Sequence, residues 1–201
     1  MHTKKNKLLL ATNNSGKLKE MSVLLRNSKL EITTPMEQGI HLEVQESGKT
    51  FRDNAILKAE AFSSVSGLMS LSDDSGLEVD ILNGEPGVMS ARYAGPNASD
   101  KDRIDYLLEK LRGVPFDRRK ARFRCVMAVA APGGKVEIFE GVCEGIISEE
   151  PKGPGGFGYD PIFYIPSLEV SMAQLSMESK NDISHRGIAS RKVRDYLASI
   201  V

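Results

Sequence analysis

The chain has 201 residues, a formal net charge of zero, and 40% hydrophobic and 27% charged residues. This balance is typical of a globular protein with a sizeable core, and it excludes disorder and a general basic surface for duplex nucleic acid. No apolar stretch is long enough for a membrane span, and residues 8–11 are too short for a signal-peptide core, so we expect a cytoplasmic protein with no nucleic-acid and no membrane partner. Cys125 and Cys143 fit no metal-ligand pattern and are expected to be buried thiols.

The first third of the chain predicts strands that alternate with helices. Residues 7–12 and 30–34 indicate two short strands, with a helix between them that starts near residue 16. A second helix is expected over residues 51–66, with Thr50 as its N-cap. It leads into an apolar strand over residues 68–73. This order predicts an α/β fold.

The rest of the chain predicts further strands around one more helix and a terminal helix. A loop or short strand is expected over residues 88–95, a helix over 99–111, and two long strands over 121–131 and 135–147, joined as a hairpin. A short strand at 162–165 precedes the terminal helix. We therefore expect a mixed, partly parallel sheet. With no linker or repeat in view, residues 1–201 are expected to form a single domain.

The turn from Thr12 to Lys17 (Thr-Asn-Asn-Ser-Gly-Lys) joins the first strand to the first helix. A helix N-terminus presents backbone N–H groups and a positive dipole end, which suits an anion such as phosphate. The glycine spacing of a Walker phosphate loop is absent. The alternative is an ordinary turn in which Asn and Ser cap the helix.

Two adjacent carboxylates, Asp73 and Asp74, follow the third strand and precede Ser75 and Gly76. Adjacent carboxylates repel each other, so keeping both ionised requires a cation. Oxygen ligands without nearby Cys or clustered His favour magnesium or manganese. Asp74 would then lie at the carboxyl end of its strand, where open α/β sheets bind ligands. The alternative is a simple turn between strands.

Residues 151–161 contain four glycines and three prolines, which exclude regular structure there. Phe157 and Tyr159 lie inside this stretch, where a ring beside glycines can stack on a flat ligand. The alternative is that both rings fill the core. Near the C-terminus, Ser184 is expected to cap the last helix, which puts His185 and Arg186 in its first turn. Cations are disfavoured there, which indicates an anion or polar ligand nearby.

Five motifs occur in one order along almost the whole chain, apart from about six residues at the start, and together they resemble the inosine triphosphate pyrophosphatase family. They are residues 11–17, Asp73-Asp74-Ser75-Gly76-Leu77, Ser90-Ala91-Arg92-Tyr93, residues 155–161 and Ser184-His185-Arg186-Gly187. The resemblance implies an elongated two-lobed α/β domain with its active site in the cleft between lobes, usually a homodimer. It also implies magnesium-dependent hydrolysis of ITP, dITP and XTP to the monophosphate and pyrophosphate, which removes these nucleotides from the pool.

The resemblance also assigns roles to residues. Asp74 is expected to be the general base and a metal ligand, and Glu46 the second metal carboxylate, although Glu43 is close in sequence. The remaining substrate-binding residues divide into two groups. The triphosphate group is Thr12, Asn13, Asn14, Ser15, Gly16, Lys17, Ser75 and Lys180. The base pocket is Phe157, Gly158, Tyr159, Asp160, His185 and Arg186. Ser179 departs from the family, where many relatives have an acidic residue, and we expect no change in the chemistry.

Two other functions use the same motifs. One is a phosphotransferase or γ-phosphatase with the same anion loop. The other is a nucleotide-sensing or single-stranded-RNA-binding module that stacks bases on Phe157 and Tyr159. The sequence alone does not choose between attack on the α- and the γ-phosphorus; that choice follows from the family resemblance.

Overall fold

The computed structural model describes residues 7–26 and 28–200, and the basic start at residues 1–6 lies outside this part. Two compact units make up the chain. Of the described residues, unit 1 contains those within 7–74, 125–141 and 186–200, and unit 2 contains residues 75–124 and 142–185. The chain crosses from one unit to the other within three strands, and again between His185 and Arg186.

In the part of the chain that the structure describes, seven strands form one sheet in the order β2-β1-β3-β4-β5-β6-β7. Their bounds are β1 Lys7–Leu10, β2 Glu31–Thr33, β3 Met69–Val79, β4 Lys120–Ala130, β5 Val136–Ile147, β6 Phe163–Ile165 and β7 Val170–Ser171. β1 pairs in parallel with β2 and β3, whereas β6 pairs antiparallel with β5 and β7. The expected α/β fold with a mixed, partly parallel sheet is therefore confirmed.

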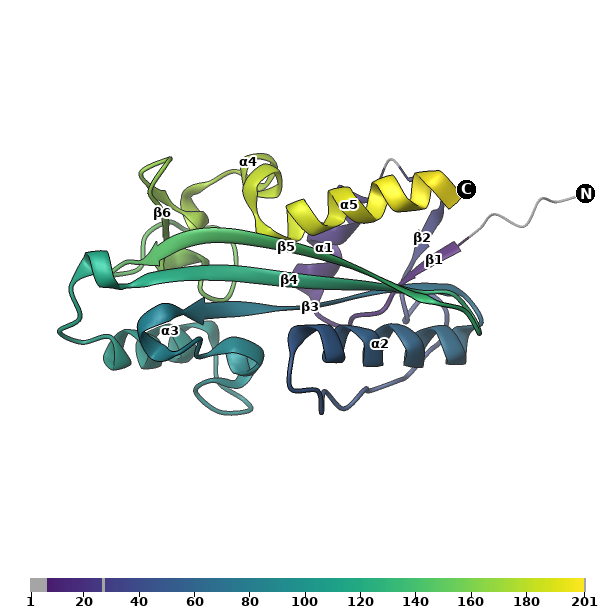
Figure 1. The fold of residues 1–201 in the computed structure, drawn as a ribbon, viewed down its shortest axis with the longest axis horizontal. Helices are drawn as coiled ribbons and strands as arrows, with labels where there is room; N and C mark the ends of the chain where they lie inside the picture. Colours follow the sequence, from purple (N-terminus) through teal and green to yellow (C-terminus); the bar gives the residue numbers. More distant parts are fainter. Residues whose placement is uncertain (1–6, 27, 201) are drawn as a thin grey trace, which may run out of the picture. The chain divides into compact units, whose positions relative to one another are not determined.

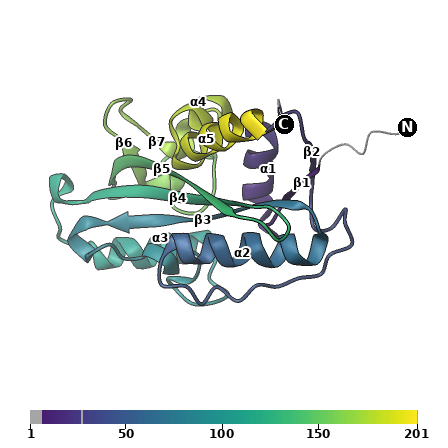
Figure 2. The same cartoon turned by 45° about the vertical axis from the view of Figure 1, so that its right-hand side comes forward.

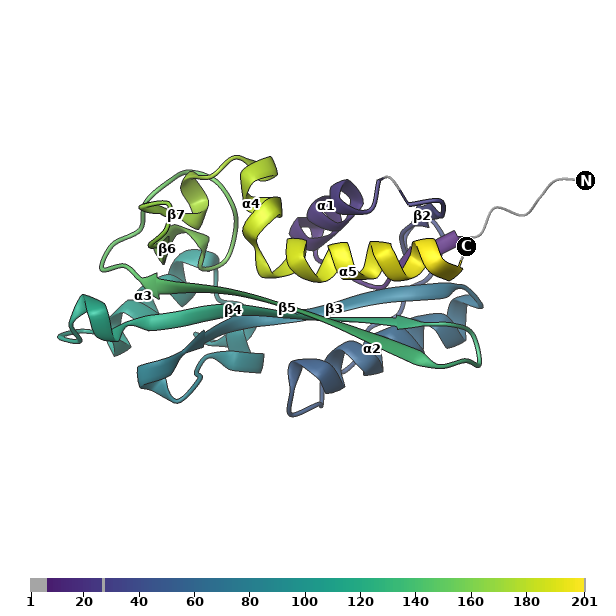
Figure 3. The ribbon, with the colours of Figure 1, turned by 45° about the horizontal axis from the view of Figure 1, so that its top comes forward.

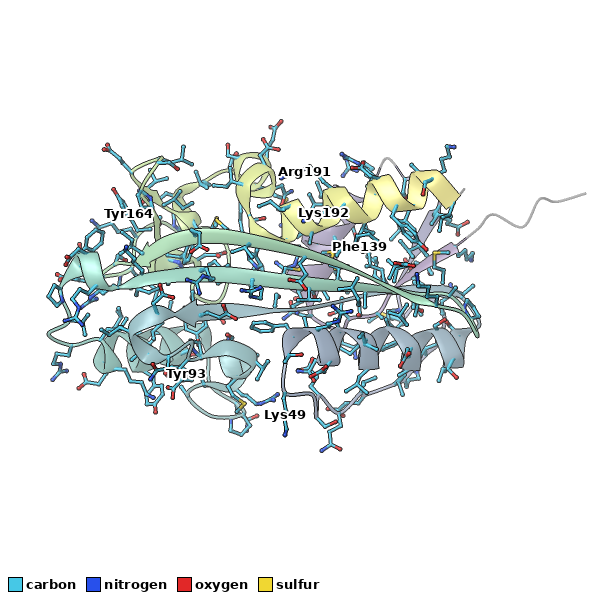
Figure 4. The ribbon with its side chains drawn as sticks, in the orientation of Figure 1. Lys49, Tyr93, Phe139, Tyr164, Arg191 and Lys192 are labelled. Atoms are coloured by element: carbon cyan, nitrogen blue, oxygen red, sulfur yellow. The ribbon has the colours of Figure 1, made fainter. Side chains whose placement is uncertain are left out.

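Helices cover both faces of the sheet in unit 1. α1 (Ser15–Leu24) and α5 (His185–Ile200) lie on one face, and α2 (Phe51–Ser66) lies on the other (Figures 1 and 3). The core under α1 and α5 includes Leu10, Met21 and Val193, all fully buried. Phe139 on β5 lies under α5 (Figure 4). The centroid of its ring lies 5.3 Å from that of the Tyr196 ring.

α2 begins and ends as its sequence predicts, and it runs along the sheet in Figure 2. Thr50 and Asp53 form a capping box at its start, and Gly67 ends it in the left-handed conformation at φ 65°. Apolar spacing places Phe62 and Val65 on one face of this helix; Phe62 is buried, whereas Val65 is 61% exposed.

Unit 2 has its own core, built from α3 (Asp100–Lys110), the strands and the loop before β6. Leu77, Leu107 and Phe163 are fully buried in it. Several elements differ from expectation: residues Gly87–Arg92 form a 3-10 helix, and neither β7 nor α4 (Met177–Ile183) was predicted. α4 is a helix of seven residues, and so short a segment shows little periodicity in its sequence.

Both cysteines are free and buried, as expected. Among the described residues, no helix combines the length and the apolar character that crossing a membrane requires.

Candidate active site

The acidic pair lies inside β3, which continues to Val79. The expectation that Asp74 ends its strand is therefore wrong, and so is the alternative of a turn. Successive side chains of a strand point to opposite faces. Asp73 accordingly meets residues of α1 and α5, and Asp74 meets residues of α2. Cations on both faces compensate the two charges, which allows the strand to pass through them without a break.

Asp73 is fully buried between two cations of unit 1. Its Oδ1 lies 2.8 Å from the Nζ of Lys17, and its Oδ2 accepts hydrogen bonds from the Nε and Nη2 of Arg186 at 3.1 and 3.0 Å. Burial by itself raises the pKa of the Asp73 carboxyl, but Lys17 and Arg186 outweigh it and lower that pKa well below its ordinary value. Asp73 is therefore a permanent anion.

Arg186 is 2% exposed and also donates from Nη1 to Glu20 on α1, at 2.5 Å. Asp73 and Glu20 thus supply the anions that a cation in the first turn of α5 requires. Although burial lowers the pKa of Arg186, these carboxylates raise it above its ordinary value. Ser184 lies at the C-terminal end of α4, where its N–H bonds the carbonyl of Lys180.

Asp74 forms a second cluster with residues of α2 and the segment before it. Its Oδ1 lies 3.1 Å from the Nζ of Lys58, which also lies 2.7 Å from Oε1 of Glu46. Asn54 donates to Oδ2 of Asp74 at 3.3 Å. Burial raises the pKa of the Asp74 carboxyl above its ordinary value, although Lys58 opposes this. Glu46, and not the exposed Glu43, therefore shares a cation with Asp74.

The Thr12–Lys17 segment joins β1 to α1, as expected. Asn14 is the N-cap of α1, and its Oδ1 accepts from the backbone N–H of Lys17 at 3.0 Å. The Oγ1 of Thr12 accepts from the N–H of Asn14 at 3.2 Å. Asn13 and Ser15 are exposed, Gly16 is half-buried, and the Lys17 side chain reaches Asp73. Asn14 thus fulfils the capping alternative, and Lys17 is ion-paired.

The Gly-rich loop of unit 2 brings several predicted residues together. Oδ2 of Asp160 accepts from the backbone N–H of Phe157 at 2.9 Å and lies 2.6 Å from the Nζ of Lys180. That ammonium lies 4.8 Å from the centre of the half-buried Phe157 ring. Asp160 and Lys180 are almost fully buried. A ring, an ammonium and a carboxylate therefore form one compact group.

Tyr159 and His185 also belong to unit 2, and both are buried. Tyr159 is 4% exposed and donates from its hydroxyl to the carbonyl of Ser90 at 3.0 Å, so its ring fills the core and anchors the loop. The ring of His185 stacks on Phe123 with centroids 4.8 Å apart. Ser75 is the half-buried residue that follows Asp74 on β3.

Comparison with known proteins shows the family of the chain. The model of the Ham1 family matches residues 8–196. The chain belongs to the Ham1 family. It is 52% identical, over 95% of both chains, to a protein from Desulforamulus reducens named dITP/XTP pyrophosphatase. Its structure is similar to the Ham1 protein of Staphylococcus aureus, with a TM-score of 0.88, 41% identity and coverage of 98% of this chain and 100% of that one. A HAM1 protein from Coxiella burnetii gives a TM-score of 0.89 at 43% identity, over 96% and 99%.

Sequence reasoning missed three polar residues of this Ham1-family chain: Lys58, Asn54 and Glu20. Each occupies a position that helical spacing assigns to a buried face. Asn54 and Lys58 lie four residues apart on α2, on the side that carries Phe51 and Phe62, and Glu20 lies three residues after Lys17 on α1. A polar residue at core spacing is the signal that would have identified them.

Proposed function

We propose that this Ham1-family protein hydrolyses the aberrant purine nucleotides ITP, dITP and XTP to the nucleoside monophosphate and pyrophosphate. The proposal draws on the name of the Desulforamulus reducens relative. The observation that carries it is the convergence of Asp74 and Glu46 on the single ammonium of Lys58, at 3.1 and 2.7 Å. Two carboxylates directed at one point can hold a metal cation. Enzymes that act on nucleoside triphosphates bind them together with such a cation.

We propose that Asp74 and Glu46 hold Mg²⁺. Carboxylate oxygens suit this ion, and two protein carboxylates suffice because magnesium keeps water and substrate phosphate as its other ligands. Within the described residues, no group of three or more His, Cys, Asp or Glu side chains is placed to hold a metal. Bound there, the ion would polarise the attacking water and offset charge on the phosphates.

In the proposed reaction, a water oxygen forms a bond to the α-phosphorus and the bond to the bridging oxygen of the β-phosphate breaks. Asp74 accepts the proton of the water, and pyrophosphate leaves with the electron pair. We assign the binding of the triphosphate to the Thr12–Lys17 segment, Ser75 and Lys180. A helix N-terminus and two ammonium groups favour the charge that grows on pyrophosphate.

We assign the base to Phe157, Gly158, Asp160, His185 and Arg186, with Tyr159 supporting the loop from the core. Phe157 would stack on any purine. Arg186 has only donors, and its guanidinium would have to turn from Asp73 and Glu20 to reach the base. There it would suit a 6-oxo group, whereas the 6-amino group of adenine would find no acceptor. A buried polar group without a partner is costly, which would turn the mismatch into discrimination. Guanine shares the 6-oxo group, so it must be rejected through its 2-amino group. Backbone groups of residues 155–160 are our candidates for this second check.

Product analysis with ITP and Mg²⁺ tests the proposal. We expect IMP and pyrophosphate, with kcat/KM for ITP and XTP well above that for GTP and ATP. Orthophosphate as the product would instead indicate a γ-phosphatase, and no turnover would indicate a binding module. The binding module is the weaker rival, because Tyr159 is only 4% exposed and its ring is not available as a stacking platform. Values of kcat/KM within a few-fold of each other for all four nucleotides would overturn the role in removing aberrant nucleotides.

We further propose that the protein acts as a cytoplasmic homodimer and that residues 1–201 work as one catalytic domain. The resemblance to the inosine triphosphate pyrophosphatase family supports both statements. Size-exclusion chromatography with light scattering would give the mass of the protein in solution directly. A mass near the 22.0 kDa of one chain would overturn the dimer.

A further inference from the structure

Two carboxylates hold consecutive backbone N–H groups in the Gly-rich loop of unit 2. Asp160 accepts from the N–H of Phe157 at 2.9 Å, and Oδ2 of Asp100 accepts from the N–H of Gly158 at 2.7 Å. These N–H groups belong to the peptide planes before and after the Cα of Phe157. Because each peptide unit is planar, holding both planes fixes φ and ψ of Phe157. The direction of its Cα–Cβ bond, from which the ring projects, is thereby determined.

This loop requires such restraint because of its glycines. Gly156 and Gly158 have φ of +73° and +60°, in the left-handed region. Glycines that adopt this region lose much conformational freedom on ordering. A Cβ at Gly156 would lie 2.2 Å from Oδ2 of Asp160, so the backbone passes directly against that carboxylate. The glycines therefore allow the loop this shape but do not restrain it, so its restraint must come from polar contacts such as those of Asp160 and Asp100.

Asp100 is itself held in place at the first residue of α3, next to the N-cap Ser99. Its Oδ1 is ion-paired with Arg103, one turn further along the helix. The Nη1 of Arg103 also donates to the carbonyls of Ala91 and Ala98, at 2.9 and 2.7 Å. Both oxygens of Asp100 thus have defined partners. Its hydrogen bond to the N–H of Gly158 therefore fixes the loop relative to α3.

We propose that Asp100 is a positioning residue that orients Phe157 for stacking on the substrate base. It touches neither the base nor the reacting atoms. It acts through the Gly158 peptide, and Asp160 acts through the Phe157 N–H and the Lys180 ammonium. A charge-assisted bond from a backbone N–H to a carboxylate is among the stronger hydrogen bonds in proteins, which suits this role. The effect on catalysis rests on the proposed function, but the effect on the loop does not.

The first experiment measures the loop without substrate. The chain contains no tryptophan, so a Phe157→Trp variant carries a single fluorescent reporter at the proposed stacking position. In this background we expect Asp100→Ala to raise the acrylamide quenching constant at least about twofold, because losing the partly buried hydrogen bond to Gly158 releases the loop. Asp102→Ala is the matched control: it removes a carboxylate of the same helical turn, which accepts hydrogen bonds from the backbone N–H and the hydroxyl of Ser99. Equal quenching in the Asp100 and Asp102 variants would overturn the proposal.

The second experiment measures kinetics with ITP in the chain that retains Phe157. We expect Asp100→Ala to raise KM about tenfold while kcat changes less than about threefold, as lost ground-state binding requires. Asp100→Asn should lie between wild type and Asp100→Ala, because an amide oxygen can still accept from Gly158. An unchanged KM, or the same rise in Asp102→Ala, would overturn the positioning role. A wild-type protein that releases no pyrophosphate would overturn the proposed function alone, and the quenching result would stand.

Discussion

Asp73 and Asp74 are neighbours on one strand, yet their surroundings differ in kind. Asp73 is fully buried, and two cations from α1 and α5 lower the pKa of its carboxyl. Asp74 shares one ammonium with Glu46, and burial raises the pKa of its carboxyl. The pleat of β3 sends the first side chain into a saturated ion network and the second toward a site with fewer fixed charges. Identical side chains can therefore have opposite roles because of the face they occupy.

The difference lies in how many cations each carboxylate has. Two close cations bind Asp73 firmly, and a carboxylate in such a network is a poor proton acceptor. Asp74 is ion-paired with Lys58, which it shares with Glu46, and accepts from the amide of Asn54, while Lys17 adds a weaker attraction. A carboxylate that is incompletely compensated can take a proton or bind a cation. We therefore assign stability to Asp73 and chemistry to Asp74, and four predictions test this division.

The largest expected effect is on activity. Asp74→Asn should lower kcat/KM for ITP by about a hundredfold or more, because the amide can neither accept a proton nor hold a metal. Its cost in stability should be only about 1 kcal/mol, since the amide oxygen can still accept from Lys58. Pyrophosphate release and urea unfolding measure the two quantities. A variant with a tenth of wild-type activity would remove Asp74 from the chemistry.

The second effect is on stability and belongs to Asp73. Asp73→Asn should lower the free energy of unfolding by about 3–5 kcal/mol, because it leaves Arg186 buried with one carboxylate fewer. Urea denaturation followed by circular dichroism gives the value, with Asp74→Asn as the control on the same strand. A loss below about 1 kcal/mol in Asp73→Asn would mean that the network tolerates a missing charge.

Much of the fold follows from the sequence because its signals are local. The Thr50–Asp53 capping box and Gly67 set both ends of α2, and the hydrophobic runs of β4 and β5 identify long strands. The strand through Asp73 was predicted to stop there because two adjacent carboxylates resemble a turn. Only cations from helices distant in sequence allow β3 to continue, and local patterns do not report them.

The candidate site also contains residues that the sequence could identify and residues that only the structure reveals. Motif order identified Lys17, Asp74 and Lys180 through a family resemblance, and geometry then added Lys58 and Glu20. The sequence could not supply those two, because a Lys or Glu on a helix face is usually solvated. Their burial depends on which strand residue faces them. Tyr159 illustrates the converse, since an aromatic ring in a glycine loop can stack on a ligand or fill a core, and here it fills the core.

The third prediction tests the partner of Asp74. Glu46→Gln should raise the Mg²⁺ concentration for half-maximal activity about tenfold or more, the low end of the effects seen for residues that support a metal. Glu43→Gln is the matched control, because Glu43 lies three residues earlier and is exposed. We expect its half-activation to stay within about twofold of wild type. If Glu43→Gln raised the Mg²⁺ requirement and Glu46→Gln did not, Glu43 would replace Glu46 as the second metal carboxylate.

The smallest effect concerns Lys58, which now occupies the point where Asp74 and Glu46 converge. The two carboxylates, together with Asp73, outweigh burial and raise the pKa of its ammonium, so Lys58 stays charged. A cation held by the same two carboxylates would lie beside this positive charge and be repelled by it.

Lys58→Met keeps much of the apolar stem and removes the charge. It should therefore lower the Mg²⁺ concentration for half-maximal activity by about threefold, a modest value because solvent and movement of the side chain screen the repulsion. Titration of activity with Mg²⁺ at saturating ITP measures this shift. A higher Mg²⁺ requirement would mean that Lys58 holds Asp74 and Glu46 in place for the metal. A large fall in kcat at saturating Mg²⁺ would mean that the ammonium itself meets the charge that develops on the phosphates.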